Sequence, residues 1–92
     1  MEKVKVIFRK TKEGEIIAFF PEASANFGNI LSYMHVGQHG EASYDFYNAT
    51  KKATETEYKM LLKELQSIYN DYILVVKQKL YYNDLIKAWK GR

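Results

Sequence analysis

The fold is decided by residues 54–76, which read TETEYKMLLKELQSIYNDYILVV. Thr54 and Glu57 have the spacing of a capping box, in which the threonine hydroxyl accepts a hydrogen bond from the Glu57 amide and the Glu57 carboxylate accepts one from the Thr54 amide. The apolar residues that follow recur at helical spacing: Tyr58, Leu61, Leu62, Leu65, Ile68 and Tyr69. The segment therefore predicts an amphipathic helix over Thr56–Tyr69.

A strand is predicted directly after this helix. The segment Tyr72–Lys79 begins with an apolar run that includes Ile73–Val76. A strand that is apolar on both faces is typical of a central position in a sheet, where both faces are at least partly covered. We therefore expect Tyr72–Lys79 to be a central strand.

The N-terminal part is typical of a β-hairpin. Residues alternate in character over Lys3–Lys10, which is the period of a strand with one buried face. Gly14 lies in the turn that follows, where glycine can adopt a positive φ. A second strand is predicted over Glu15–Phe20, and it ends at Pro21 because proline donates no ladder hydrogen bond. These two strands are predicted to pair antiparallel.

The middle of the chain is richer in turn formers. Residues 22–31 predict a loop, in which the turn formers are Asn26, Gly28 and Asn29. A third strand is predicted over Ile30–Val36. Residues 37–40 then form either a bulge or a turn into a further strand over Glu41–Phe46.

Together these elements predict one α+β domain over residues 1–92. Its sheet is antiparallel and has four strands, or five if the glycine-containing segment 37–40 makes a hairpin. The main amphipathic helix packs on one face of the sheet. A short C-terminal helix, capped by Asn83 and running over Asp84–Lys90, covers an edge or part of the other face.

Composition excludes several classes of protein. The chain is 47% hydrophobic and 27% charged, with 5 Gly and 1 Pro, which excludes disordered and collagen-like chains. Cysteine is absent, so disulfides and thiolate metal sites are excluded. No apolar run approaches the roughly 20 residues that span a bilayer. The N-terminus lacks an apolar signal core, so we expect a cytoplasmic protein without membrane contact.

The charge is distributed unevenly along the chain. Residues 1–12 carry five basic and one acidic side chain, residues 13–50 carry five acidic and no basic ones, and residues 72–92 again carry five basic and one acidic. If the first and last strands are neighbours, their basic side chains form one face. The candidates for nucleic-acid contact on it are Lys5, Arg9, Lys77 and Lys79, with nearby aromatic residues that could stack on bases. A plain solubilising surface is the alternative.

A second candidate site lies in residues 32–41, which read SYMHVGQHGE. Both histidines of the chain, two glycines and one carboxylate fall within His35–Glu41. A turn at either glycine could bring His35, His39 and Glu41 together as metal ligands or as a general base, but the spacing matches no strong metal motif. The alternative is a binding surface without metal or cofactor, with these candidates: Tyr33, His35, Gln38, His39 and Glu41.

Residues 31–42, LSYMHVGQHGEA, followed by the threonine-capped helix, resemble an uncharacterised family of small proteins from bacterial mobile elements and phages. The resemblance spans about residues 4–79, and residues 80–92 lie outside it. That family has no established activity, so the resemblance implies no catalytic residues. It implies an accessory factor of a mobile element or phage.

The sequence therefore favours a non-enzymatic binding or regulatory module in the cytoplasm. Its partner is a protein or a nucleic acid, and a homo-oligomer stays open. The alternative is a small metal- or histidine-dependent enzyme that uses His35, His39 and Glu41. The positions of the two imidazoles separate these hypotheses. Imidazoles that share an exposed cleft favour the enzyme, whereas imidazoles that point apart or are hydrogen-bonded to the backbone favour the binding module.

Overall fold

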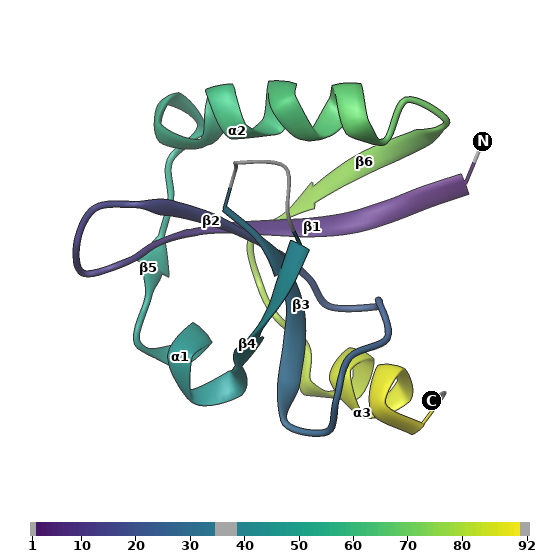
Figure 1. Ribbon diagram of the computed structural model, residues 1–92. Coiled ribbons are helices and arrows are strands. Elements are labelled where there is room, and N and C mark those ends of the chain that lie inside the picture. Colours follow the sequence, from purple (N-terminus) through teal and green to yellow (C-terminus); the bar gives the residue numbers. More distant parts are fainter. Residues whose placement is uncertain (1, 35–38, 91–92) are drawn as a thin grey trace.

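The computed structural model describes residues 2–34 and 39–90, and in them a sheet lies between two layers of helices (Figure 1). The α+β fold class predicted from the sequence is confirmed. The elements in chain order are β1 (Glu2–Lys10), β2 (Ile16–Phe20), β3 (Asn29–Tyr33), β4 (His39–Ser43), α1 (Tyr44–Asn48), β5 (Lys51–Lys52), α2 (Glu55–Ile68), β6 (Tyr72–Lys77) and α3 (Tyr82–Lys90).

Strand β1 is the centre of the sheet. On one side it pairs antiparallel with β2, which confirms the predicted hairpin, and the ladder continues antiparallel through β3 to β4. On its other side, residues Glu2–Ile7 pair with β6 and residues Arg9 and Lys10 pair with β5. The first and last predicted strands are therefore neighbours.

One face of the sheet packs against α2, which lies above the strands in Figure 1. Val6 and Phe8 of β1 point to this face, where the Tyr58 ring of α2 stacks on Phe8 with centroids 4.4 Å apart. Leu61 and Leu65 extend the same cluster along the helix. The helical spacing read from the sequence is thus the stripe by which α2 covers the sheet.

The opposite face packs against α1 and α3, which lie below the strands in Figure 1. Ile7 of β1 points to this side and joins Phe19, Tyr47 of α1 and Leu85 of α3 in a second cluster. The Phe19 and Tyr47 rings meet edge to face at 5.0 Å. The C-terminal helix therefore does cover part of the second face, as predicted.

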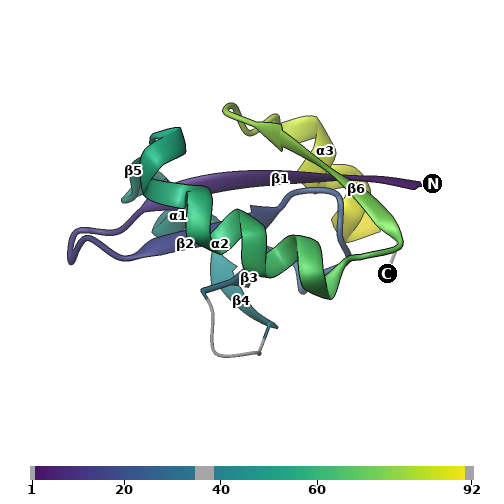
Figure 2. The same ribbon diagram turned by 90° about the horizontal axis from the view of Figure 1, so that it is seen from above.

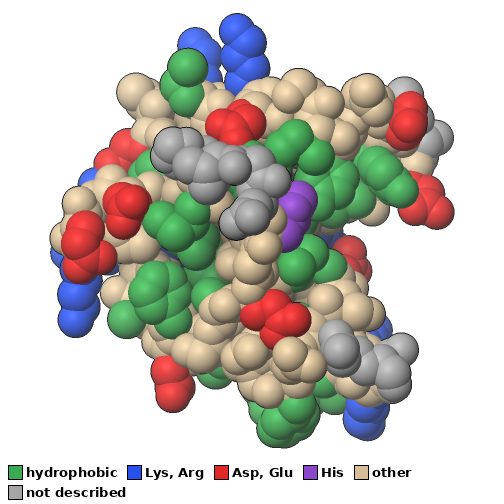
Figure 3. Space-filling model, viewed as in Figure 1, with side chains coloured by type: hydrophobic (Ala, Val, Ile, Leu, Met, Phe, Trp, Pro, Cys, Tyr) green, Lys and Arg blue, Asp and Glu red, His purple; other side chains and the backbone are tan. Residues whose placement is uncertain are grey.

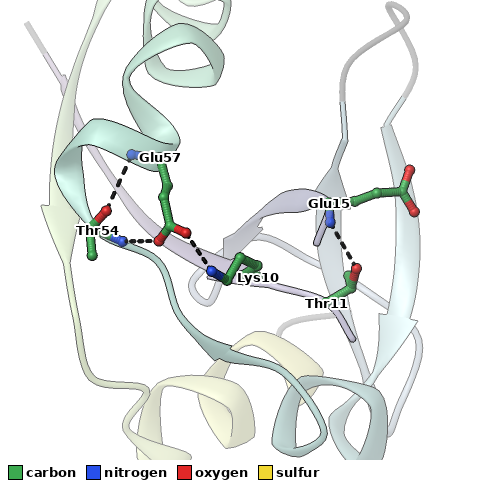
Figure 4. A network of polar contacts seen from close by, with 5 residues as sticks. All are labelled: Lys10, Thr11, Glu15, Thr54 and Glu57. Carbon is green, nitrogen blue, oxygen red and sulfur yellow. Dashed lines mark hydrogen bonds and ion pairs between the residues drawn. The ribbon is translucent and has the colours of Figure 1, made fainter. Parts of the chain in front are cut away.

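The predicted capping box is present at the N-terminus of α2, and its Glu57 also forms an ion pair with Lys10 at the end of β1 (Figure 4). Thr54 Oγ1 accepts from the Glu57 amide at 3.3 Å, and Glu57 Oε1 accepts from the Thr54 amide at 2.9 Å. The other carboxylate oxygen of Glu57 accepts from Lys10 Nζ at 2.5 Å. These hydrogen bonds, first that from Lys10 and then that from the Thr54 backbone, lower the pKa of Glu57 to about 2.

The predicted strand over Glu41–Phe46 is wrong in its second half. Strand β4 ends at Ser43, and Tyr44–Asn48 form helix α1. The Ser43 hydroxyl accepts from the Phe46 amide at 3.0 Å, so Ser43 is the N-cap of α1, and Asp45 lies in the first turn, where the helix dipole favours an acidic residue.

The predicted position of the last strand is also wrong. Strand β6 ends at Lys77 and pairs with β1 alone among the described residues, so it is an edge strand. The pairing is parallel, in contrast to the fully antiparallel sheet expected, because the α2 crossover returns the chain in the direction of β1. Its apolar pattern arises because Leu74 and Val76 pack against the cluster under α2, while Ile73 on the other face is 44% exposed.

Smaller differences concern the element ends. Helix α2 begins and ends one residue earlier than predicted, and α3 begins at Tyr82, so Asn83 lies inside that helix. Strand β3 runs over Asn29–Tyr33, so it begins one residue earlier than the predicted third strand and leaves out Met34; residues 35 and 36 of that prediction lie outside the described part. None of the helices described is long and apolar enough to cross a membrane.

The low pKa of Glu57 predicts a specific acid sensitivity. The unfolded carboxyl group titrates near its ordinary value of 4.5 and the folded one near 2. Between about pH 5 and about pH 2 the unfolded state therefore binds more protons, and the free energy of unfolding falls as the pH falls. Urea unfolding at low salt should show that Glu57→Gln flattens this part of the pH profile. Glu55→Gln is the matched control, and an equal effect of both substitutions would contradict the prediction.

Candidate binding surface

His39, the described histidine of the candidate block, lies in an aromatic environment between β4 and α2. Its ring centroid is 5.0 Å from that of Tyr33, and 5.8 Å from those of Phe20 and Tyr69. Its Nε2 is hydrogen-bonded to the Tyr69 hydroxyl at 2.6 Å, and burial raises the pKa of Tyr69. Figure 3 shows the histidine side chain among hydrophobic ones on this face. One imidazole nitrogen of His39 is thus used to join the sheet to the end of α2.

Tyr33, another candidate for binding, lies in the core. Its side chain is 1% exposed, and its hydroxyl donates to the carboxylate of Glu64 on α2. Tyr33 and His39 are cross-strand neighbours in the β3–β4 ladder. Two polar side chains of this sheet face therefore reach the same helix, which gives both a role in holding α2 against the sheet.

Glu41 is hydrogen-bonded to the turn that precedes β3, away from the aromatic residues around His39. Its Oε1 accepts hydrogen bonds from the Asn26 amide and from Asn29 Nδ2, both at 3.1 Å. His35 and Gln38, the remaining candidates, lie outside the described residues. Within the described ranges there is no group of three or more His, Cys, Asp or Glu residues that could hold a metal ion. In the hydrogen bonds described here His39 thus contacts Tyr69, and Glu41 contacts Asn26 and Asn29.

The turn that Glu41 holds is fixed at several points. The Asn29 amide donates to the Asn26 carbonyl at 2.8 Å, and Gly28 has φ +88°, which closes a tight turn that favours glycine. The Tyr44 amide donates to the Gly28 carbonyl at 2.9 Å. Trp89 Nε1 of α3 donates to the Asn29 carbonyl at 2.8 Å. The turn is thus bonded to β4, to the start of α1 and to α3.

Phe27 lies at the corner of this turn and is 84% exposed. The centroid of its ring lies 4.9 Å from that of Trp89. The Trp89 ring in turn lies 5.9 Å from the Tyr82 ring, and the Tyr82 ring lies 5.7 Å from the Tyr44 ring. We call these four side chains the aromatic row. Figure 3 shows hydrophobic side chains projecting at the bottom of the molecule, where Figure 1 places this turn and α3. Sequence reasoning identified the turn formers around Phe27 and missed Phe27 itself.

Two of the four nucleic-acid candidates are engaged within the protein. Lys5 Nζ lies 3.4 Å from Asp84 and 3.6 Å from Glu22, and the hydrogen bond to Asp84 raises the pKa of Lys5. Arg9 donates to Thr50 Oγ1 at 3.0 Å and to the Thr50 carbonyl at 2.6 Å. Its guanidinium also lies 4.7 Å from the centre of the Tyr47 ring. These contacts join β1 to α3 and to the segment after α1.

The other two nucleic-acid candidates are exposed. Lys77 lies opposite Ile7 in the parallel ladder, so it shares a face with Lys5 and Arg9. Lys79 Nζ lies 5.4 Å from the centre of the Tyr81 ring. Lys5, Arg9 and Lys77 therefore do lie on one face of the sheet, as predicted. The side chains of Lys5 and Arg9, however, already have partners within the protein.

Comparison of the chain with protein-family models, with curated proteins and with solved structures finds no match. The resemblance to a mobile-element and phage family therefore stays a prediction.

The geometry of the turn predicts different costs at two glycines. A Cβ at Gly28 meets no atom within 4 Å, yet its φ of +88° disfavours any L side chain. Gly28→Ala should lower the free energy of unfolding by about 1–2 kcal/mol. Gly40→Ala, at a position with equal space and no positive φ, should change it by less than about 0.5 kcal/mol. Urea unfolding followed by circular dichroism measures both, and equal losses would contradict the assigned turn.

Proposed function

We propose that the chain is a non-enzymatic binding module that docks a partner protein on the aromatic row. The observation that carries this proposal is Phe27, an 84% exposed aromatic side chain on a turn held by Glu41, Tyr44 and Trp89. Aromatic anchors dominate the binding energy of many protein interfaces. A turn that is already fixed loses little conformational entropy when it binds.

The surroundings of the row favour a protein over a nucleic acid. Glu41 lies directly against the turn, and Asp45 follows Tyr44 in the sequence, within the segment 13–50 that carries five acidic and no basic side chains. These carboxylates would repel phosphates. Of the basic candidates, Lys5 and Arg9 are occupied by internal contacts.

The same contacts give His39 and Glu41, the two described candidates of the histidine block, structural roles. His39 contributes one ring nitrogen to Tyr69, and Glu41 contributes an oxygen to the turn that carries Phe27. In this proposal His39 is an anchor for α2, and Glu41 positions the binding surface. The setting, an accessory factor of a mobile element or phage acting in the cytoplasm, is part of the proposal and rests on the resemblance of residues 31–42.

A photocrosslinking experiment tests the proposal. Benzoylphenylalanine placed at Phe27 should form a protein adduct in cells that express the chain, whereas the same group at Met60, which is 77% exposed on α2, should not. Excess unlabelled wild-type chain should suppress the adduct. Unlabelled Phe27→Ala chain lacks the aromatic anchor, so it should suppress the adduct only at about tenfold higher concentration than the wild type, or not at all.

Two outcomes would overturn the proposal. One is equal crosslinking at Phe27 and Met60, or none at Phe27. The other is saturable binding of single-stranded DNA or RNA at low salt, read as quenching of Trp89, the single tryptophan of the chain. Quenching that disappears in Phe27→Ala would instead assign the row to base stacking.

A further inference from the structure

Strand β6 presents an open, apolar edge. Among the described residues its only ladder partner is β1, so the hydrogen-bonding groups on its other side have no strand to pair with. Figure 2, seen from above, shows β6 crossing beside β1 at the margin of the sheet. Tyr72 is 40% exposed and Ile73 is 44% exposed. An edge of this kind is a template for pairing with another strand.

The edge at the opposite end of the sheet is much less suited to pairing. Strand β4 reads HGEAS and carries Gly40 and the charged Glu41. Strand β6 reads YILVVK and has no glycine, proline or charged residue before Lys77. Proteins usually protect exposed edges with such residues. The segment Tyr72–Val76 contains none of them, so this edge is open to pairing with a partner strand.

We propose that β6 pairs antiparallel with β6 of a second copy of this chain. A two-fold axis perpendicular to the sheet, passing between the two Leu74 residues, places Ile73 of each copy opposite Val75 of the other. It also brings Asp71, the turn residue directly before β6, to the level of Lys77 of the other copy. Neither Asp71 nor Lys77 forms an ion pair with any other residue that the structure describes. The antiparallel dimer would therefore set these two opposite charges against each other.

The symmetric pairing is consistent with the layers of the fold. A perpendicular two-fold axis keeps both α2 helices on the same face of one continuous sheet, so the cluster under α2, which includes Leu74 and Val76, would continue across the interface. A parallel arrangement would instead set equal charges beside each other at both ends of the strand. Because one short strand from each copy forms the contact, the buried area lies at the low end for specific interfaces, below about 1,200 Å². The dimer should therefore be weak and dependent on concentration.

Sedimentation velocity over about 10 µM to about 1 mM tests this dimer. The wild-type chain should shift from monomer to dimer within that range. Asp71→Lys and Lys77→Glu should each weaken association by about tenfold, because each turns two attractive pairs into repulsive ones. The double variant Asp71→Lys, Lys77→Glu should regain the wild-type affinity. Lys63→Glu on α2 changes the charge as Lys77→Glu does and should have no effect.

The swapped variant separates loss of the interface from loss of the fold, because a misfolded chain would not regain dimerisation. A wild-type chain that stays monomeric at the highest concentration would overturn the proposal. So would a dimer whose affinity is unchanged by the single charge reversals, since its interface would then lie elsewhere. The Phe27→Ala chain should dimerise like the wild type. The dimer proposal and the proposal that the aromatic row binds a partner can therefore be refuted independently of each other.

Discussion

The structure depends on the burial of three consecutive residues of β1. Val6 is 0% exposed, Ile7 is 1% exposed and Phe8 is 3% exposed. Because side chains of a strand alternate between the two faces, three buried neighbours require that both faces of the sheet are covered. Helix α2 covers the side of Val6 and Phe8, and α1 and α3 cover the side of Ile7. The order of layers in the molecule follows from this one strand.

The polar residues of β1 fasten these layers in place. Lys10 bonds to Glu57 at the N-terminus of α2, Arg9 bonds to Thr50 beyond the end of α1, and Lys5 bonds to Asp84 on α3. The layer of α2 thus receives one basic side chain from the central strand, and the layer of α1 and α3 receives two. This use of the cations explains why a strand rich in Lys and Arg leaves little free positive charge for a polyanionic ligand, and why the exposed aromatic row is the better candidate surface.

Features with local causes could be predicted from the sequence. The capping box and apolar stripe fixed α2 to within one residue, and the alternation of β1 with the Gly14 turn gave the hairpin. Helix α1 was missed because it has only five residues, and its signal is little more than the Ser43 cap. The edge position of β6 was missed because the apolar pattern of a strand indicates that its side chains are buried, here by α2. It does not indicate whether the strand has a neighbour on one side or on both.

The candidate surface depends on contacts between distant parts of the chain. Glu41 lies 15 residues from Asn26 and Trp89 lies 60 residues from Asn29, yet both hold the turn that presents Phe27. Local patterns identify such a turn but do not show what fixes it. Likewise, the spacing of His39 and Glu41 did not show that each faces a different partner.

The central position of β1, with β6 parallel to it, is tested most directly by nuclear Overhauser effects between methyl groups in solution. The register pairs Val4 with Leu74 and Val6 with Val76. The account predicts strong effects within these two pairs. Strong effects between Val4 and Val76, and between Val6 and Leu74, would instead show an antiparallel pairing and contradict it.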